Sequence, residues 1–232
     1  MKNFYLNQTF RLAAQYLEYV TLDNAVERKL AKACLETFTY EDFAKMHEQW
    51  LSTGHMVFFV YGNFAQDAAI ALVEEARKVF DIKATSKDSL STVRCVQITG
   101  NHHRVDFDVE DPKNENSVLM TYYQFGIEGN DPRSKLLNEV ALQFLDEPTF
   151  NQLRTVEQLG YVVWSRHNVK RDVVGAWFLV QSPNKGCSHI KASFNSHMKK
   201  MLKKVEDMTE KEFDEQRNAV LTQYSEKDVN LN

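Results

Sequence analysis

The sequence predicts an α+β fold, an antiparallel-rich mixed sheet with helices packed on one face. Two kinds of pattern lead to this prediction. Residues 93–125 and 161–181 show the alternation of apolar and polar side chains that is typical of strands, and turn-forming residues join them. Apolar residues recur at helical spacing before, between and after these two regions. The strands are therefore expected to form a sheet with the helices grouped beside it.

The first part of the chain, residues 1–80, is expected to form three helices, one strand and a fourth helix. Thr39, followed three residues later by Asp42, resembles a capping box that opens the third helix. The apolar run at residues 56–61 predicts a buried strand. A lone strand leaves its edge hydrogen bonds unmade, so it is expected to join the other sheet or strands outside this chain. The helical stripes are Phe10, Ala13, Ala14, Leu17 and Val20; Ala25, Val26, Leu30 and Cys34; Phe43, Met46, Trp50 and Leu51; and Ala65, Ala69, Leu72, Ala76 and Val79.

Residues 81–92 are expected to link two domains, because this stretch is polar and lacks apolar periodicity. Strand alternation follows at residues 93–97, 105–109 and 117–125. The segment 111–116 has the composition of a turn between two of these strands.

A helix is expected next, with Asp131 as N-cap and Pro132 as its first residue. Pro148 is expected to interrupt it, and a short helix over residues 149–158 is expected to end at Gly160 in a left-handed cap. The residues expected to face the core are Leu137, Val140, Ala141, Phe144 and Leu145.

The C-terminal part is expected to form a hairpin of residues 161–165 and 173–181, followed by two helices. Thr209 and Glu212 predict a capping box at the start of the last helix. The apolar stripes of the two helices are Ile190, Phe194, Met198, Met201 and Val205, and Phe213, Val220, Leu221 and Tyr224.

The composition is that of an ordinary globular protein, with 43% apolar and 26% charged residues. A net charge of −4 gives no basic footprint for nucleic acid or an anionic membrane surface, so neither is expected as a partner. No apolar run approaches the roughly 20 residues that a membrane helix needs. Because Cys34, Cys95 and Cys187 lie far apart and no secretory signal is apparent, a reducing, cytoplasmic location is expected.

Sequence motifs give no sign of a metal or cofactor on this chain. Neither H-E-x-x-H nor H-x-x-E-H occurs among the seven histidines, and the phosphate-loop, dinucleotide and hydrolase-elbow motifs are absent. The adjacent His102 and His103 are interpreted as a solvated pair rather than as zinc ligands.

The most informative stretch is residues 147–161. Arg154 lies on the expected short helix and Tyr161 begins the next strand, so a guanidinium and a phenol could converge on one rim. Both groups donate hydrogen bonds without changing their protonation state, which suits a carbonyl oxygen or a developing oxyanion. Alternatively, Arg154 pairs with Glu157 on its own helix and Tyr161 simply packs.

The run from Phe150 to Tyr161, F-x-x-L-R-T-x-E-Q-L-G-Y, resembles the late motif of the insulysin and nardilysin group of the pitrilysin-type zinc metallopeptidases. The similarity extends over nearly the whole chain, including residues 1–63. Further matching segments are Tyr122-Tyr123-Gln124, Glu147-Pro148, Val180-Gln181-Ser182 and Asp207-Met208-Thr209-Glu210-x-x-Phe213.

This resemblance implies a place in a larger enzyme. Such peptidases have four homologous α+β domains that form two halves around a closed chamber, and the first domain carries the inverted zinc motif. Residues 1–80 would be the C-terminal part of the third domain, 81–92 a linker, and 93–232 most of the fourth, non-catalytic domain. The strands that complete the first sheet would precede this chain, and zinc is expected in the missing catalytic domain.

The resemblance also implies a site. By motif position, Arg154 and Tyr161 would reach across the chamber and hydrogen-bond the substrate backbone, supporting the transition state. The remaining motif residues are Phe150, Glu157, Gln158 and Gly160. No catalytic or metal-binding residue is expected on this chain alone. Some members bind polyanions at a basic cluster beyond the last helix, but residues 223–228 keep only Lys227, so this site is not expected here.

The functional hypothesis is a non-catalytic C-terminal portion of an insulysin-like zinc metalloendopeptidase that helps to enclose and position short peptide substrates. Its partners would be peptides and the missing N-terminal catalytic half. The alternative is a truncated, proteolytically inactive paralogue that acts as a structural or protein-binding module. Without its neighbours, the chain is expected to expose apolar strand edges and either to self-associate or to be marginally stable.

Overall fold

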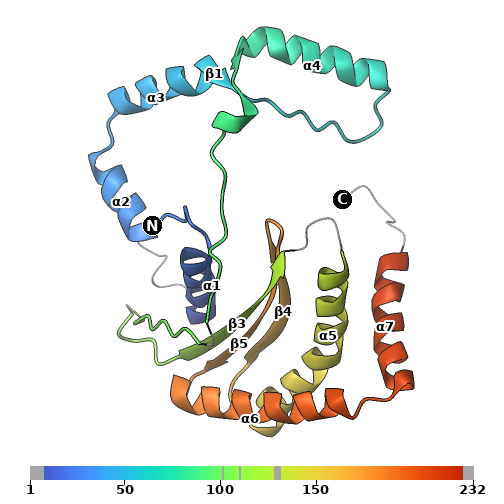
Figure 1. Cartoon of the computed structure of the whole chain (residues 1–232). Helices are drawn as coiled ribbons and strands as arrows, with labels where there is room; N and C mark the ends of the chain where they lie inside the picture. Colours follow the sequence, from blue (N-terminus) through green and yellow to red (C-terminus); the bar gives the residue numbers. More distant parts are fainter. Residues whose placement is uncertain (1–7, 101, 110, 128–131, 227–232) are drawn as a thin grey trace. The chain divides into compact units, whose positions relative to one another are not determined.

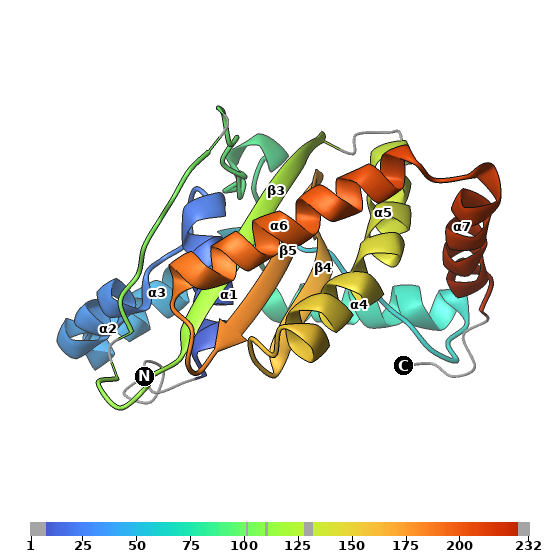
Figure 2. The same cartoon turned by 90° about the horizontal axis from the view of Figure 1, so that it is seen from below.

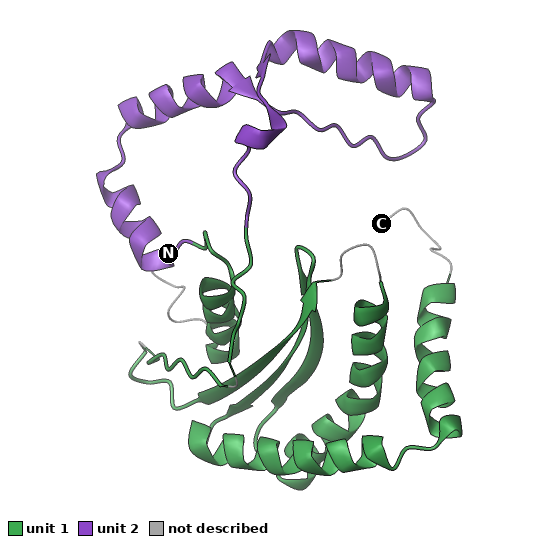
Figure 3. Cartoon of the chain, viewed as in Figure 1, with its two compact units in different colours: residues 1–25, 94–227 green, residues 26–93, 228–232 purple. Residues whose placement is uncertain are grey.

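The computed structural model describes residues 8–100, 102–109, 111–127 and 132–226 (Figure 1). The chain divides into two compact units (Figure 3): unit 1 comprises Met1–Ala25 and Arg94–Lys227, and unit 2 comprises Val26–Val93 and Asp228–Asn232. The assignment of residues 1–80, 81–92 and 93–232 to two peptidase domains and a linker stays a prediction. Within the described ranges, no helix combines the length and apolarity needed to cross a membrane.

Unit 1 is built on a three-stranded antiparallel sheet in the order β3-β5-β4. The strands are β3 (Ser117–Ile127), β4 (Val162–Lys170) and β5 (Val173–Ser182). The expected hairpin is confirmed. Its first strand is longer than predicted and continues to Lys170, so that a short turn at Arg171, where φ is 55°, joins the two strands. An irregularity between Gln124 and Gly126 shifts the register of β3 against β5. The prediction of a mixed helix and antiparallel-sheet fold is therefore confirmed.

Helices α5 (Arg133–Phe150) and α6 (Cys187–Glu206) cover one face of this sheet, and Figure 2 shows α6 running across it. Between α5 and β4 lies η2 (Asn151–Val156), a π-helix, and α7 (Glu210–Ser225) packs beside α5. The core between the sheet and these helices consists of Leu142, Leu153, Leu159, Val163, Ala176, Phe178, Val180, Ile190 and Phe194.

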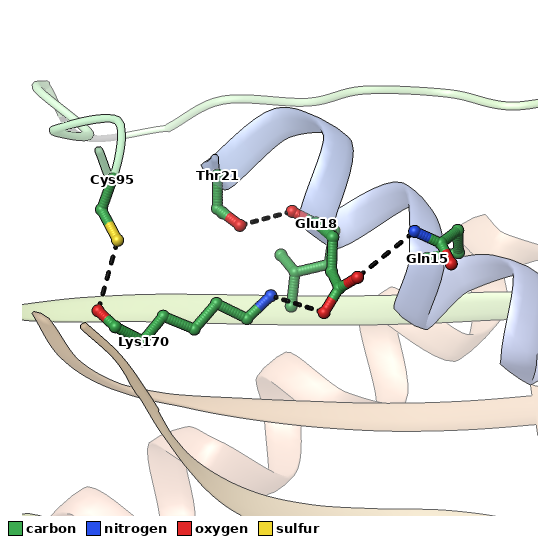
Figure 4. A network of polar contacts seen from close by, with 6 residues as sticks. Gln15, Glu18, Thr21, Cys95 and Lys170 are labelled. Atoms are coloured by element: carbon green, nitrogen blue, oxygen red, sulfur yellow. Dashed lines mark hydrogen bonds and ion pairs between the residues drawn. The ribbon is translucent and has the colours of Figure 1, made fainter. Parts of the chain in front are cut away.

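Helix α1 (Thr9–Thr21) lies on the opposite face, so the sheet carries helices on both faces rather than one (Figures 1 and 2). The ring of Phe10 meets Trp164 edge-on, with 4.8 Å between centroids, and Trp164 alternates with the core residue Val163 along β4. A polar network joins α1 to the end of β4 (Figure 4): Lys170 Nζ lies 3.3 Å from Glu18 Oε1.

Two expected strands of unit 1 do not form. Residues 93–97 contribute only an isolated bridge between Leu22 and Cys95, and residues 105–109 are irregular. The side chain of Gln124 takes the place of a backbone ladder: it accepts from the Ile98 amide at 2.9 Å and donates to the Val96 carbonyl at 3.0 Å. Because these backbone groups bond to a side chain, the alternating pattern does not become a paired strand.

Helix α5 also differs from its prediction. It begins at Arg133, and the expected N-cap Asp131 lies outside the described residues. Pro148 does not interrupt it: the helix continues to Phe150 and then widens into the π-helix. Proline removes one ladder bond, and burial of Leu153 at 0% exposure holds the following backbone helical.

The face that α5 buries was predicted only in part: Leu145 packs against the core. Leu137 is 54% exposed and Ala141 is exposed, whereas Asn138 and Leu142 are buried. The Asn138 side chain donates to the Gly175 carbonyl of β5 at 3.0 Å, so a polar residue with a buried partner occupies a core position. A pattern of apolar residues alone could not predict that position.

Unit 2 contains the helices α2 (Arg28–Thr37), α3 (Tyr40–Ser52) and α4 (Gln66–Phe80) and the short 3₁₀-helix η1 (Lys87–Ser89). It also contains two strands of two residues each, β1 (Thr53–Gly54) and β2 (Lys83–Ala84). The capping box of Thr39 and Asp42 is confirmed, with each side chain bonded to the other residue's backbone amide. No residue of α2, α3 or α4 is buried. This unit therefore has helices without a core of its own.

The buried strand expected at residues 56–61 is not formed. This segment has no regular secondary structure, and the side chains of Val57 and Phe59 are 81% and 86% exposed. β1 and β2 pair only with each other, and no described strand lies beside residues 56–61 to accept a hydrogen-bonded ladder. A β-forming run without a partner cannot satisfy its backbone, which explains the failure of the prediction.

Candidate functional site

The structure brings together Arg154 and Tyr161, the two residues that sequence reasoning selected. The guanidinium carbon of Arg154 lies 5.9 Å from the centre of the Tyr161 ring and 4.7 Å from the centre of the Phe150 ring. All three side chains are exposed, and Tyr161 is 85% exposed. A cation held over two aromatic faces is attracted by both ring quadrupoles, so the guanidinium is oriented before any ligand arrives. We call these three residues the Arg–Tyr rim.

The π-helix sets the direction in which Arg154 points. Its neighbour Leu153 is fully buried in the core, and the Leu159 amide donates to the Leu153 carbonyl at 3.0 Å. The Glu157 amide donates to the Gln152 carbonyl at 2.9 Å, which is the wider bond of a π-turn. With Leu153 turned inward, Arg154 is left on the solvent side.

Two motif residues, Gln158 and Gly160, turn the chain from the π-helix into β4. The left-handed residue is Gln158, with φ 51°, and not Gly160 as the sequence predicted. Gly160 has a different purpose, because a Cβ there would lie 1.9 Å from the backbone oxygen of Gln181 on β5. Glycine is needed for this close approach of two backbone segments.

Glu157 does not form the alternative ion pair with Arg154. Its carboxylate accepts from Gln152 Nε2 at 2.9 Å, and no ion pair joins Glu157 to Arg154, both of which the structure describes. Burial would raise the pKa of this carboxyl. Hydrogen bonds from Gln152 and Ser193 outweigh that effect, helped by the nearby rings of His189 and His197, and lower the pKa of Glu157.

Sequence reasoning missed a buried polar contact next to the rim. Thr149 Oγ1 and His197 Nε2 lie 3.0 Å apart, and the two residues are 1% and 5% exposed. The signal was present in the sequence: His197 falls between Phe194 and Met201 at helical spacing on the face of α6 that is buried. Burial lowers the pKa of His197; Glu157 opposes this effect, and Lys200 and Lys204 reinforce it.

His197 gives the fold an expected pH dependence. Because the folded-state pKa of His197 is lowered, the unfolded chain binds a proton more readily below about pH 6.5, the ordinary histidine value. The free energy of unfolding should therefore be constant near neutrality and fall as the pH drops below that value, by at most about 1.4 kcal/mol per pH unit from this group. Urea unfolding at pH 7.5, 6.5 and 5.5 checks this, and His197→Gln should flatten the difference. An equal fall in both proteins would contradict the assignment.

The described residues do not fit a metal site. Nowhere in the described part of the chain do three His, Cys, Asp or Glu side chains cluster so as to hold an ion. His102 and His103 are both exposed, and the His103 ring contacts the Thr99 carbonyl. What the Arg–Tyr rim can offer chemically is a pair of hydrogen-bond donors, one charged and one neutral, that face solvent.

Comparison with known proteins shows what this chain is similar to. Residues 140–232 match the family model described as "PQQ synthase PqqF-like, C-terminal lobe domain 4". The insulin-degrading enzyme of Homo sapiens is 27% identical over 217 residues, which cover 92% of this chain and 21% of the relative. A nardilysin-like protein of Arabidopsis thaliana is 32% identical over 127 residues, 54% of this chain and 12% of the relative. This chain is homologous to the C-terminal part of the insulysin-like, pitrilysin-type metallopeptidases.

The fold agrees with this assignment. The crystal structure of pitrilysin matches 89% of this chain and 21% of its own length, with a TM-score of 0.71 and 22% identity. Residues 140–232, which the family model matches, include Arg154, Tyr161 and His197. The chain spans about a fifth of the length of insulin-degrading enzyme, 21% for the human protein.

Proposed function

We propose that this chain is the non-catalytic C-terminal portion of an insulysin-like zinc metalloendopeptidase, where it helps to enclose and position short peptide substrates. The observation that carries the proposal is the Arg–Tyr rim, in which two exposed donors lie side by side at the start of β4. The homology to insulysin-like peptidases supports a peptide as the ligand.

The chemistry of the rim is hydrogen-bond donation. The Arg154 guanidinium and the Tyr161 hydroxyl would donate to carbonyl oxygens of the peptide backbone near the bond that is cleaved. The guanidinium also lies over Phe150, 4.7 Å from its ring centre, so little reorganisation is needed on binding. Donors fixed in advance stabilise negative charge as it develops on a carbonyl oxygen.

Zinc has no place on the described part of this chain, since no group of ligands there could hold it. The metal and its activated water would belong to the missing catalytic half, and the rim would supplement them. This chain would therefore bind and orient the peptide without cleaving it.

We expect the purified chain to leave a fluorogenic peptide uncleaved, with or without added zinc, and to add to cleavage once a catalytic half is supplied. Cleavage by the chain alone that a chelator abolishes, with contaminating peptidases excluded, would overturn the proposal. If the chain has no effect on a catalytic half, the alternative of a structural or protein-binding module replaces it.

A further inference from the structure

A polar residue on the buried face of α6 contacts the segment that leads into the π-helix. His197 Nε2 lies 3.0 Å from Thr149 Oγ1, and Thr149 stands two residues before the π-helix begins at Asn151. The π-helix is thus tied to α6 on its N-terminal side.

The contact at Thr149 is deeply buried. Thr149 is 1% exposed and His197 is 5% exposed, so neither side chain can exchange its partner for water. Leu153, four residues further on, is fully buried in the core. The backbone from Thr149 to Leu153 is therefore fixed at two places on the inner side, while Arg154 leaves from the outer side.

A hydrogen bond constrains this segment more than apolar packing would. Packing tolerates rotation of the helix by a few degrees, whereas a buried hydroxyl and a buried imidazole nitrogen lose each other as hydrogen-bond partner when the distance of 3.0 Å is not kept. A rotation of the π-helix would also move the Arg154 guanidinium away from Phe150 and Tyr161.

We propose that Thr149 and His197 are positioning residues, which lock the π-helix against α6 and thereby hold Arg154 in the Arg–Tyr rim. This inference rests on the proposed role of Arg154 toward peptide substrates. The charged and titratable groups that face His197 are Glu157, from the end of the π-helix, and Lys200 and Lys204, from α6 itself. Neutral His197 is the form that completes the lock near pH 7.

The first test needs only this chain. Thr149→Val keeps the shape of the side chain and removes the hydroxyl, and Thr149→Ser is the matched control that retains it. We expect amide exchange of Glu157 and Leu159 to become roughly tenfold faster in Thr149→Val, with β5 amides unchanged, and to stay near wild type in Thr149→Ser. Equal acceleration in β5, or equal behaviour of the two variants, would overturn the lock.

The second test links the lock to the rim. In the presence of a catalytic half, Thr149→Val should lower kcat more than it raises KM. The control Thr149→Ser should keep kcat near the wild-type value. If Arg154→Ala lowers kcat but Thr149→Val does not, the positioning inference is wrong while the proposed function stands. If neither substitution affects kcat although exchange is locally faster, the proposed function fails and the lock remains.

Discussion

Replacing Gly160 by alanine should destabilise unit 1 by about 3 kcal/mol or more. The added Cβ would lie 1.9 Å from the Gln181 oxygen and 3.0 Å from its carbonyl carbon, both backbone atoms of the central strand. These atoms cannot move aside without breaking the β4–β5 ladder, in which Val162 pairs with Gln181. The measurement is urea unfolding monitored by circular dichroism, with the midpoint converted to a free energy.

The chain offers a matched control for this substitution. At Gly186 an added Cβ would have no heavy atom within 4 Å and φ is −73°, so Gly186→Ala should change the stability by less than about 1 kcal/mol. If the two alanine variants unfold at the same urea concentration, the close approach of residues 160 and 181 is not the reason for glycine in this motif.

Removing the Arg154 side chain should lower kcat/KM of the assembled peptidase about 100- to 1,000-fold, as the loss of one fixed oxyanion donor does in other enzymes. Arg154→Ala is expected to leave stability nearly unchanged, because Arg154 is exposed and its contacts are with the faces of Phe150 and Tyr161. Steady-state kinetics with a catalytic half and a fluorogenic peptide measure the loss.

Two further variants show whether the loss is specific. Arg217 forms a surface ion pair with Asp214 on α7, 2.9 Å apart, and Arg217→Ala should leave kcat/KM unchanged. Arg154→Lys keeps the charge but not the planar guanidinium, so it should recover only part of the activity. Equal kinetics for Arg154→Ala and Arg217→Ala would exclude a role for the rim in cleavage.

Local sequence signals predicted much of the fold because their causes are local. The capping boxes at Thr39 and Thr209 form as expected, and each uses residues only three apart. In the predicted stripe of α6, Ile190, Phe194 and Met201 are buried and Met198 is partly buried, whereas Val205 is 49% exposed. The convergence of Arg154 and Tyr161 was also predictable, because a short helix and a following strand place them on one rim.

The errors involve partners that a local pattern does not reveal. Residues 56–61 have a strand composition but no described neighbour to pair with, and Val96 and Ile98 bond to the Gln124 side chain instead of forming a ladder. The continuation of α5 past Pro148 depends on burial of Leu153. Gly160 was assigned to a cap because its clash with Gln181 arises only when β4 and β5 meet.

A photo-crosslinking amino acid placed at Tyr161 shows whether the Arg–Tyr rim meets the peptide substrate, because this side chain is 85% exposed and contacts the Arg154 guanidinium. The chain carrying it is combined with a catalytic half and a peptide substrate, illuminated, and analysed by mass spectrometry. We expect a covalent adduct on the peptide next to the bond that is cleaved. Adducts that involve only protein, with the peptide still bound and cleaved, would contradict this expectation.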